Sequence, residues 1–250
     1  MMLTPQIIHF CTAALTVVLS SLGTALGQGI AGIGTIKALN RQEMGRPQTM
    51  RALLIGLALI ESGGILALVI ALMLLFTGHG EEMTWGIAWA EMGIGVSLGL
   101  AAAVVGIASG FAVRAACAST MRQPFFAQKI ITLMLLSQSM IEAPVIFAFI
   151  IALMIKAAIH PALGTFEGVK LFAAGLVMGL GCIGPSIGQA FFTTASCSSV
   201  GTNRKAYKSL FAFSLLNQAI IETPVIFCLL LSVLLIFRSD RKSTRLNSSH

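Results

Sequence analysis

The chain has 250 residues, of which 56% are hydrophobic and 10% are charged, and its formal net charge is +7. Soluble domains carry about 25% charged residues, so this composition excludes an ordinary soluble protein and indicates a polytopic membrane protein. The basic residues lie mostly in short loops, which is typical of topology signals, and we expect no nucleic-acid partner. The five cysteines have no metal-type spacing and the four histidines are isolated, so we assign chemistry to neither.

Six apolar stretches follow one another, and each exceeds the roughly 20 residues that a helix needs to cross a bilayer. They span residues 6–38, 51–77, 86–119, 127–158, 168–200 and 206–237. The start of the chain lacks a basic segment, so we expect no cleaved signal peptide. We predict an all-α membrane protein in which six transmembrane helices form three tandem antiparallel helical hairpins, over residues 6–80, 86–160 and 166–237.

The last 13 residues, 238–250, differ in composition from everything before them. They are polar and basic, and we predict that they form a disordered tail. They also resemble cloning-derived sequence, so the fold prediction leaves them aside.

The loops between the stretches alternate in charge. The loops after the first, third and fifth stretches are basic, whereas those after the second and fourth are poor in Lys and Arg. By the positive-inside rule, the basic loops face the cytoplasm and both termini lie outside. We therefore expect a multi-pass protein of the inner (cell) membrane.

The second helix of each hairpin carries one glutamate in the middle of an apolar run. The three segments read LALIESGGIL, QSMIEAPVIF and QAIIETPVIF, and their glutamates, Glu61, Glu142 and Glu222, are 81 and 80 residues apart. A carboxylate in hydrocarbon costs about 2.5–3.5 kcal/mol on insertion scales. A structural hydrogen-bond role would suit one such residue, but three at one interval indicate ion-binding carboxylates.

The first helix of each hairpin is rich in small residues and carries a polar residue 33 positions before the glutamate. Small residues let helices approach closely in lipid. An antiparallel hairpin that turns near residues 44–48 brings Gln28 and Glu61 to similar depth. Gln138 and Gln218, one turn before their glutamates, are either site partners or interhelical contacts. The predicted supporting residues are Gln28, Ser62, Ser109, Gln138, Gln189, Gln218 and Thr223.

Each hairpin resembles the c-subunit, the proteolipid of the rotor ring of F-type ATP synthases. The resemblance lies in the small-residue first helix, the Arg-Gln(-Pro) loop, and the carboxylate about 20 residues after that arginine. Three copies in register resemble a triplicated, fused c-subunit. The loop favours the F-type over vacuolar or archaeal-type proteolipids, although the third repeat has Thr202 where the others have Arg41 and Arg122.

This resemblance implies a homo-oligomeric ring in membrane lipid, whose carboxylates carry ions past an arginine of the stator's a-subunit. It implies a non-catalytic rotor component with no catalytic residue, no cofactor and no resident metal, since ATP chemistry belongs to partner subunits. It also implies that the basic loops touch the central-stalk subunits. The loop residues concerned are Arg41, Gln42, Arg122, Gln123, Pro124, Asn203 and Arg204.

The transported ion is either H⁺ or Na⁺, and the sequence favours protons. The second repeat has Ala143 after its glutamate, where the others have Ser62 and Thr223, and a ring must use every site. Oxygen ligands would suit Na⁺ at the glutamates, so sodium stays open. A secondary transporter is the alternative from another class, but transporter repeats often surround one shared site, whereas each repeat here has its own carboxylate.

Overall fold

The computed structural model describes residues 4–40, 43–77 and 83–247, the last nine of these by their backbone alone. The described chain is almost entirely helical, because long apolar stretches that cross a membrane must satisfy their backbone hydrogen bonds internally. The elements are α1 (Pro5–Leu39), α2 (Arg46–Phe76), α3 (Trp85–Arg122), η2 (Pro124–Phe126), α4 (Ala127–Ala158), α5 (Thr165–Gly181), α6 (Ile183–Thr202), η3 (Arg204–Ala206) and α7 (Tyr207–Asn247).

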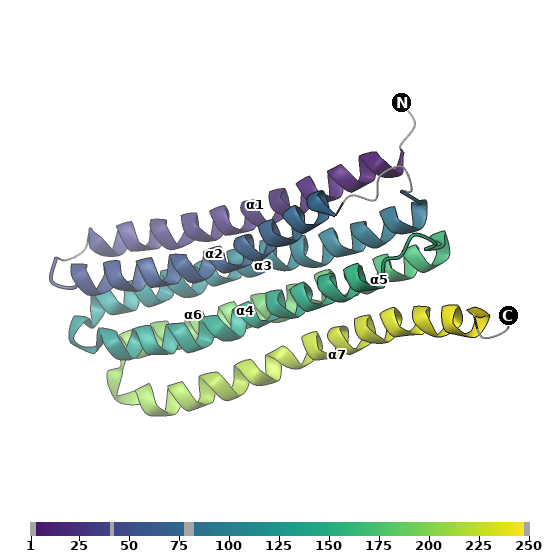
Figure 1. Ribbon diagram of the computed structural model, residues 1–250. Helices are drawn as coiled ribbons and strands as arrows, with labels where there is room; N and C mark the ends of the chain where they lie inside the picture. Colours follow the sequence, from purple (N-terminus) through teal and green to yellow (C-terminus); the bar gives the residue numbers. More distant parts are fainter. Residues whose placement is uncertain (1–3, 41–42, 78–82, 248–250) are drawn as a thin grey trace.

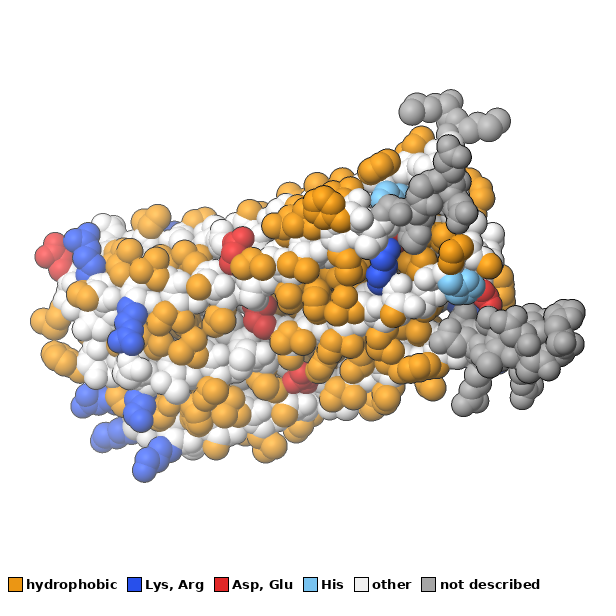
Figure 2. All heavy atoms as spheres, viewed as in Figure 1, with side chains coloured by type: hydrophobic (Ala, Val, Ile, Leu, Met, Phe, Trp, Pro, Cys, Tyr) orange, Lys and Arg blue, Asp and Glu red, His pale blue; other side chains and the backbone are white. Residues whose placement is uncertain are grey.

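Within the described residues, six helical segments are long and apolar enough to span a membrane, as predicted. They run side by side as long rods, and both termini lie at the same end of the bundle (Figure 1). We call this the termini end. The opposite end, where α1 turns into α2, α3 into α4 and α6 into α7, is the loop end. Figure 2 shows Lys and Arg side chains gathered at the loop end and acidic side chains about halfway along the bundle.

The helices form two layers. The inner layer consists of α1, α3 and the pair α5–α6, with α3 packed against both neighbours. The outer layer consists of α2, α4 and α7, each packed on its own hairpin's inner helix. Helix α3 is the most enclosed span, because it contacts helices of all three hairpins.

Glycines set the spacing of the inner layer. A Cβ atom on Gly27 of α1 would overlap the carbonyl oxygen of Gly106 on α3, and one on Gly110 would overlap the backbone of Gly27. On the other side of α3, Gly93 meets Gly175 of α5 backbone to backbone in the same way. Such close approach gives packing contacts in lipid, where no hydrophobic force drives helices together.

The inner span of the third hairpin differs from the other two, because it is broken at Cys182 into α5 and α6. The cause is Pro185, which has no N–H to donate to the carbonyl of Gly181 four residues earlier. The backbone N–H groups of Cys182 and Ser186 still donate to residues four positions back, so the break is local. The two pieces together make the single span Thr165–Thr202.

The predicted disordered tail, 238–250, begins inside α7, which continues to Asn247. No Gly or Pro follows Pro224, so the sequence contains no strong helix breaker there. Residues 248–250 lie outside the described residues, as do Arg41 and Gln42 of the first basic loop.

Candidate ion-binding site

Glu142 lies in the most complete of the three carboxylate environments. Its side chain is 8% exposed, in the middle of α4. The hydroxyl of Ser109 on α3 donates to Oε1 at 2.8 Å, and the hydroxyl of Ser62 on α2 donates to Oε2 at 3.0 Å. Both oxygens of the carboxyl group therefore face a hydroxyl, and the site is closed on two sides by different hairpins.

The contact from Ser62 corrects the pairing expected from the sequence. Ser62 follows Glu61 in the chain, and these two residues were expected to share one site. The structure instead directs the Ser62 hydroxyl to Glu142 of the next hairpin. By the repeat spacing, the residue equivalent to Ser62 in the second hairpin is Ala143, which has a methyl group in place of the hydroxyl.

Glu61 has a partner from its own hairpin. Gln28 on α1 donates from Nε2 to Glu61 Oε2 at 2.6 Å, so these two residues lie at one depth, as the hairpin geometry predicted. Ser109 and Glu142 are related in the same way in the second hairpin. Glu61 is exposed, because none of the described hairpins covers it on the side away from α4.

Glu222 is only half-buried on α7. The side chain of Gln189 on α6 does not donate to it; its Nε2 donates instead to the backbone carbonyl of Gln218 at 3.2 Å. Thr223, the residue after Glu222, is half-buried on α7, the last of the outer helices that the structure describes. Among the described residues, no hydrogen bond joins Glu222 to either residue.

Gln138 and Gln218 make interhelical contacts in the outer layer. Gln138 donates to the backbone carbonyl of Gly56 on α2 at 3.3 Å. Gln218 donates to the hydroxyl of Ser137 on α4 at 2.9 Å. Each glutamine therefore bonds to the preceding outer helix at the equivalent position, and neither donates to a glutamate.

The predicted loop residues connect the inner helices to the outer helices. Arg122 ends α3, Gln123 is its C-cap and Pro124 opens the short helix η2. In the next hairpin, the Asn203 side chain accepts a hydrogen bond from the backbone N–H of Lys205 at 3.1 Å. Arg204 opens η3. Both connections, from α3 to α4 and from α6 to α7, lie at the loop end (Figure 1).

Sequence reasoning missed a buried polar cluster near the termini end. Glu91 on α3 is fully buried, and its Oε2 accepts a hydrogen bond from Nδ1 of His9 on α1 at 2.7 Å. Its Oε1 lies 3.7 Å from Nζ of Lys156 on α4. The available signal was Glu91 itself, a charge inside the third apolar stretch, but it has no counterpart in the other repeats, where Phe10 and Leu171 stand.

Comparison with known proteins gives a match in every hairpin. The family model described as the ATP synthase C-subunit matches residues 11–74, 92–155 and 172–235. Each of the three glutamates lies 50 residues after the first matched residue of its segment. His9, Glu91 and Lys156 all lie just outside the matched segments.

Single-hairpin relatives match in part of the chain. An ATP synthase c-subunit of Dehalococcoides mccartyi is 44% identical over 69 residues, which is 28% of this chain and 91% of that protein. The ATP synthase c-subunit numbered 2 of Cereibacter sphaeroides is 45% identical over 73 residues, or 29% of this chain and 88% of the relative. An ATP synthase c-subunit of Pelobacter propionicus is 36% identical over 76 residues, which is 30% of this chain and 84% of that protein. Each relative corresponds in length to about one hairpin.

Proposed function

Because the chain belongs to the ATP synthase c-subunit family, we propose that its three glutamates, Glu61, Glu142 and Glu222, are the ion-carrying sites of an F-type rotor ring. The c-subunit is a membrane rotor component and is not itself catalytic. The observation that carries the proposal is the Glu142 site, in which a carboxyl group in the middle of a membrane span has hydroxyl partners on both oxygens.

The environment of Glu142 suits a group that changes its ionisation reversibly. Burial disfavours the charged form, so the carboxyl travels through lipid protonated and neutral. Hydroxyl donors from Ser62 and Ser109 stabilise the ionised form when water or a cation reaches the site. One charge that crosses the membrane potential gains about 2.3 kcal/mol per 100 mV, and successive ions can thus turn a ring.

The contact between Ser62 and Glu142 supports a rule for assembling the sites. Each glutamate takes its second partner from the outer helix of the preceding hairpin. Glu61 has no such second partner among the described residues, so the rule leaves its site incomplete in one copy. We propose that Thr223 of a second copy takes the place that Ser62 takes beside Glu142, which makes a ring of copies head to tail.

Protons remain the favoured ion, with Na⁺ as the alternative. A cation held by oxygen ligands needs several of them around each carboxylate. Under the assembly rule, Glu222 faces Ala143, and this site offers fewer side-chain oxygens than the other two. Proton binding needs only the carboxyl group, so it tolerates three unlike sites in one ring.

The remaining proposed partners are those that membership of the ATP synthase c-subunit family implies. We propose that the stator's a-subunit exchanges ions with the glutamates and that central-stalk subunits bind the loop end. The basic loops then face the cytoplasm and both termini lie outside the inner membrane. Lys and Arg gathered at the loop end support this orientation (Figure 2).

The test is labelling by a hydrophobic carbodiimide, which reacts with protonated carboxyl groups inside the membrane. We expect Glu61, Glu142 and Glu222 to be modified in the purified, lipid-embedded protein, as read by mass spectrometry of their peptides. Glu43, exposed at the loop end, is the matched control and should stay unmodified. Protection by Na⁺ would identify sodium as the ion. Labelling of Glu43 at the same rate as the three glutamates would refute the proposal.

A further inference from the structure

A pocket of about 270 Å³ opens between α1 and α3 at the loop end. Three cationic side chains line it: Lys37 from α1, and Arg114 and Arg122 from α3. All three are exposed. Within the described residues, none of the three forms an ion pair, and no acidic residue lines the pocket. Three like charges around one cavity favour an anionic ligand.

The pocket lies on the side of the inner layer that faces away from the outer helices. Gln28 points toward α2, where it bonds to Glu61. Lys37 comes nine residues later, which is two and a half helical turns and therefore the opposite face of α1. Arg114 is five residues after Ser109, which points toward α4, so it also turns away from the outer layer.

Arg114 lies deep for a charged residue. It is about 7.5 Å along α3 from Ser109, which is level with the Glu142 carboxyl group. A charge at this depth in hydrocarbon is costly unless its side chain reaches an anion or water. Gly34 leaves room for it, since a Cβ atom there would overlap the Arg114 side chain. The side chain thus crosses the seam between α1 and α3 toward the pocket.

Two of the three charges of this pocket are not part of the repeat, whereas Arg122 is equivalent to Arg41 of the first hairpin. The positions equivalent to Lys37 in the other hairpins hold Ala118 and Ser198, and those equivalent to Arg114 hold Ile33 and Thr194. The junction between the second and third hairpins is therefore uncharged at these positions. A feature present at one junction and absent at the next is not needed to pack hairpins together.

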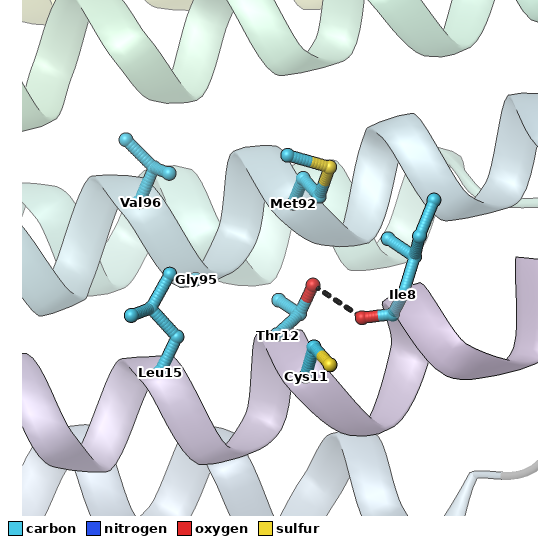
Figure 3. Close-up of a pocket in the computed structure, with 7 residues that line it drawn as sticks. All are labelled: Ile8, Cys11, Thr12, Leu15, Met92, Gly95 and Val96. Atoms are coloured by element: carbon cyan, nitrogen blue, oxygen red, sulfur yellow. Dashed lines mark hydrogen bonds between the residues drawn. The ribbon is translucent and has the colours of Figure 1, made fainter. Parts of the chain in front are cut away.

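The rest of the same seam is apolar. Toward the termini end, a second pocket of about 160 Å³ lies between α1 and α3, and its lining includes Leu15, Met92 and Val96 (Figure 3). The surface between the two pockets exposes Leu22 and Leu26 of α1. A cationic pocket followed by an apolar surface matches an amphiphile with a phosphate head and hydrocarbon chains.

We propose that Lys37, Arg114 and Arg122 bind the phosphate group of an anionic phospholipid, whose chains lie along the inner face of α1 and α3. Basic pockets between membrane helices are suited to such head groups, and each Lys or Arg strengthens the attraction. Arginine adds paired N–H donors that match phosphate oxygens. This placement rests on the proposed function: in the ring proposed above, the inner layer would line the central opening and the lipid would sit inside it.

The experiment uses the purified full chain, delipidated in detergent and titrated with phosphatidylglycerol, with binding read by native mass spectrometry. Replacing Lys37, Arg114 and Arg122 by Gln together should weaken phosphatidylglycerol binding about a hundredfold. The matched control replaces Arg51, Lys129 and Lys208 by Gln, which removes the same charge from outer helices near the loop end. This control should bind like the unaltered chain. Arg114→Lys keeps the charge and should retain most of the binding, which excludes misfolding as the cause.

Three outcomes would overturn the proposal. The first is equal loss in both triple variants, which would indicate general attraction to the basic end. The second is unchanged binding in the pocket variant. The third is binding of inorganic phosphate alone, in a parallel titration, as tightly as phosphatidylglycerol, which would make the pocket a free-phosphate site. Circular dichroism of each variant checks that the helices are intact.

Discussion

At the scale of single residues, the three glutamates have unlike surroundings although their sequence positions are equivalent. Glu142 has two hydroxyl partners, Glu61 has an amide partner and Glu222 has neither in one copy of the chain. Ser62 and Ala143 occupy equivalent positions. The second and third sites therefore differ in this hydroxyl group and in the first-helix partner, since Ser109 donates to Glu142 whereas Gln189 donates to a backbone carbonyl.

Ser62→Ala should therefore affect Glu142 and leave Glu61 unchanged. A hydrogen bond to a charged group contributes about 1.5–3 kcal/mol, so its loss favours the protonated, reactive carboxyl group. We expect carbodiimide labelling of Glu142 to become roughly tenfold faster at neutral pH. Ala143→Ser is the reciprocal variant and should slow labelling of Glu222. A change at Glu61 in place of Glu142 would contradict the pairing between hairpins.

The sequence alone predicted which polar residues share one depth within a hairpin, but not which of them meet between hairpins. The depth of a residue follows from counting along a hairpin, and this count brought Gln28 to Glu61 and Ser109 to Glu142. The partner of Ser62 depends on how one hairpin is staggered and rotated against the next. That arrangement is set by side-chain packing between repeats, for which residue spacing carries no information.

At the scale of helices, the contact between α1 and α3 does not by itself fix how far one helix is shifted along the other. Small residues recur along α1 and α3, so a slip of one turn would bring other small residues into contact. The cluster of His9, Glu91 and Lys156 occurs once and joins α1, α3 and α4. A slip would separate a fully buried carboxylate from its partners, at a large cost in free energy. This cluster thus favours one register.

Removing one member of the cluster should destabilise the chain more than removing all three. His9→Ala removes a hydrogen bond to the Glu91 carboxylate and leaves this carboxylate buried. We therefore expect the free energy of unfolding to fall by about 3 kcal/mol. A triple variant with His9→Ala, Glu91→Leu and Lys156→Leu replaces the cluster with apolar side chains and should be nearly neutral. Unfolding in a denaturing detergent series measures both. Additive losses would argue against a coupled cluster.

The glycine seam gives a second prediction at this scale. Gly27→Val would place methyl groups against the backbone of Gly106, so α1 and α3 must separate and the single chain should unfold more easily. Gly29→Val is the matched control, because the space around Gly29 is open in one copy. We expect the control to leave the stability of the single chain unchanged. A comparable loss in both variants would indicate a helix-propensity effect.

Sequence reasoning predicted every membrane span but not the break in the third inner helix. Pro185 was visible, yet prolines inside α4 and α7 leave those helices continuous. The difference at Cys182 lies in its neighbours, since Gly181 and Gly184 flank it and give the backbone more freedom. The length of an apolar stretch predicts where a span lies. Whether the helix is continuous depends on how proline and glycine residues are combined within it.

At the scale of the whole molecule, the chain has two free edges that correspond to its internal junctions. Gly29 on α1 is equivalent to Gly110, which meets Gly27 inside the chain. Gly184 on α6 is equivalent to Gly23, which meets Ala103 of α3. Both Gly29 and Gly184 have open space around them. The two edges are therefore complementary, and copies joined head to tail continue the internal pattern.

Isolated rings should contain hairpins in a multiple of three. Each chain contributes three hairpins, and complementary edges leave no need for another kind of protein in the ring. Imaging a purified ring along its axis counts the hairpins directly. A count that is not divisible by three would reveal an added single-hairpin protein and refute a ring of this chain alone. Gly29→Val should prevent closed rings from forming while single chains remain folded.

The hydroxyl that Glu142 receives and Glu222 lacks has a consequence for motion. A rotor built from identical ion sites advances in uniform steps, because every ion binds and leaves with the same free energy. In the ring proposed above, three kinds of ion site would follow one another in a fixed order. Pauses between steps would then repeat with a period of three steps. The site that exchanges its ion most slowly would limit the rate of every revolution.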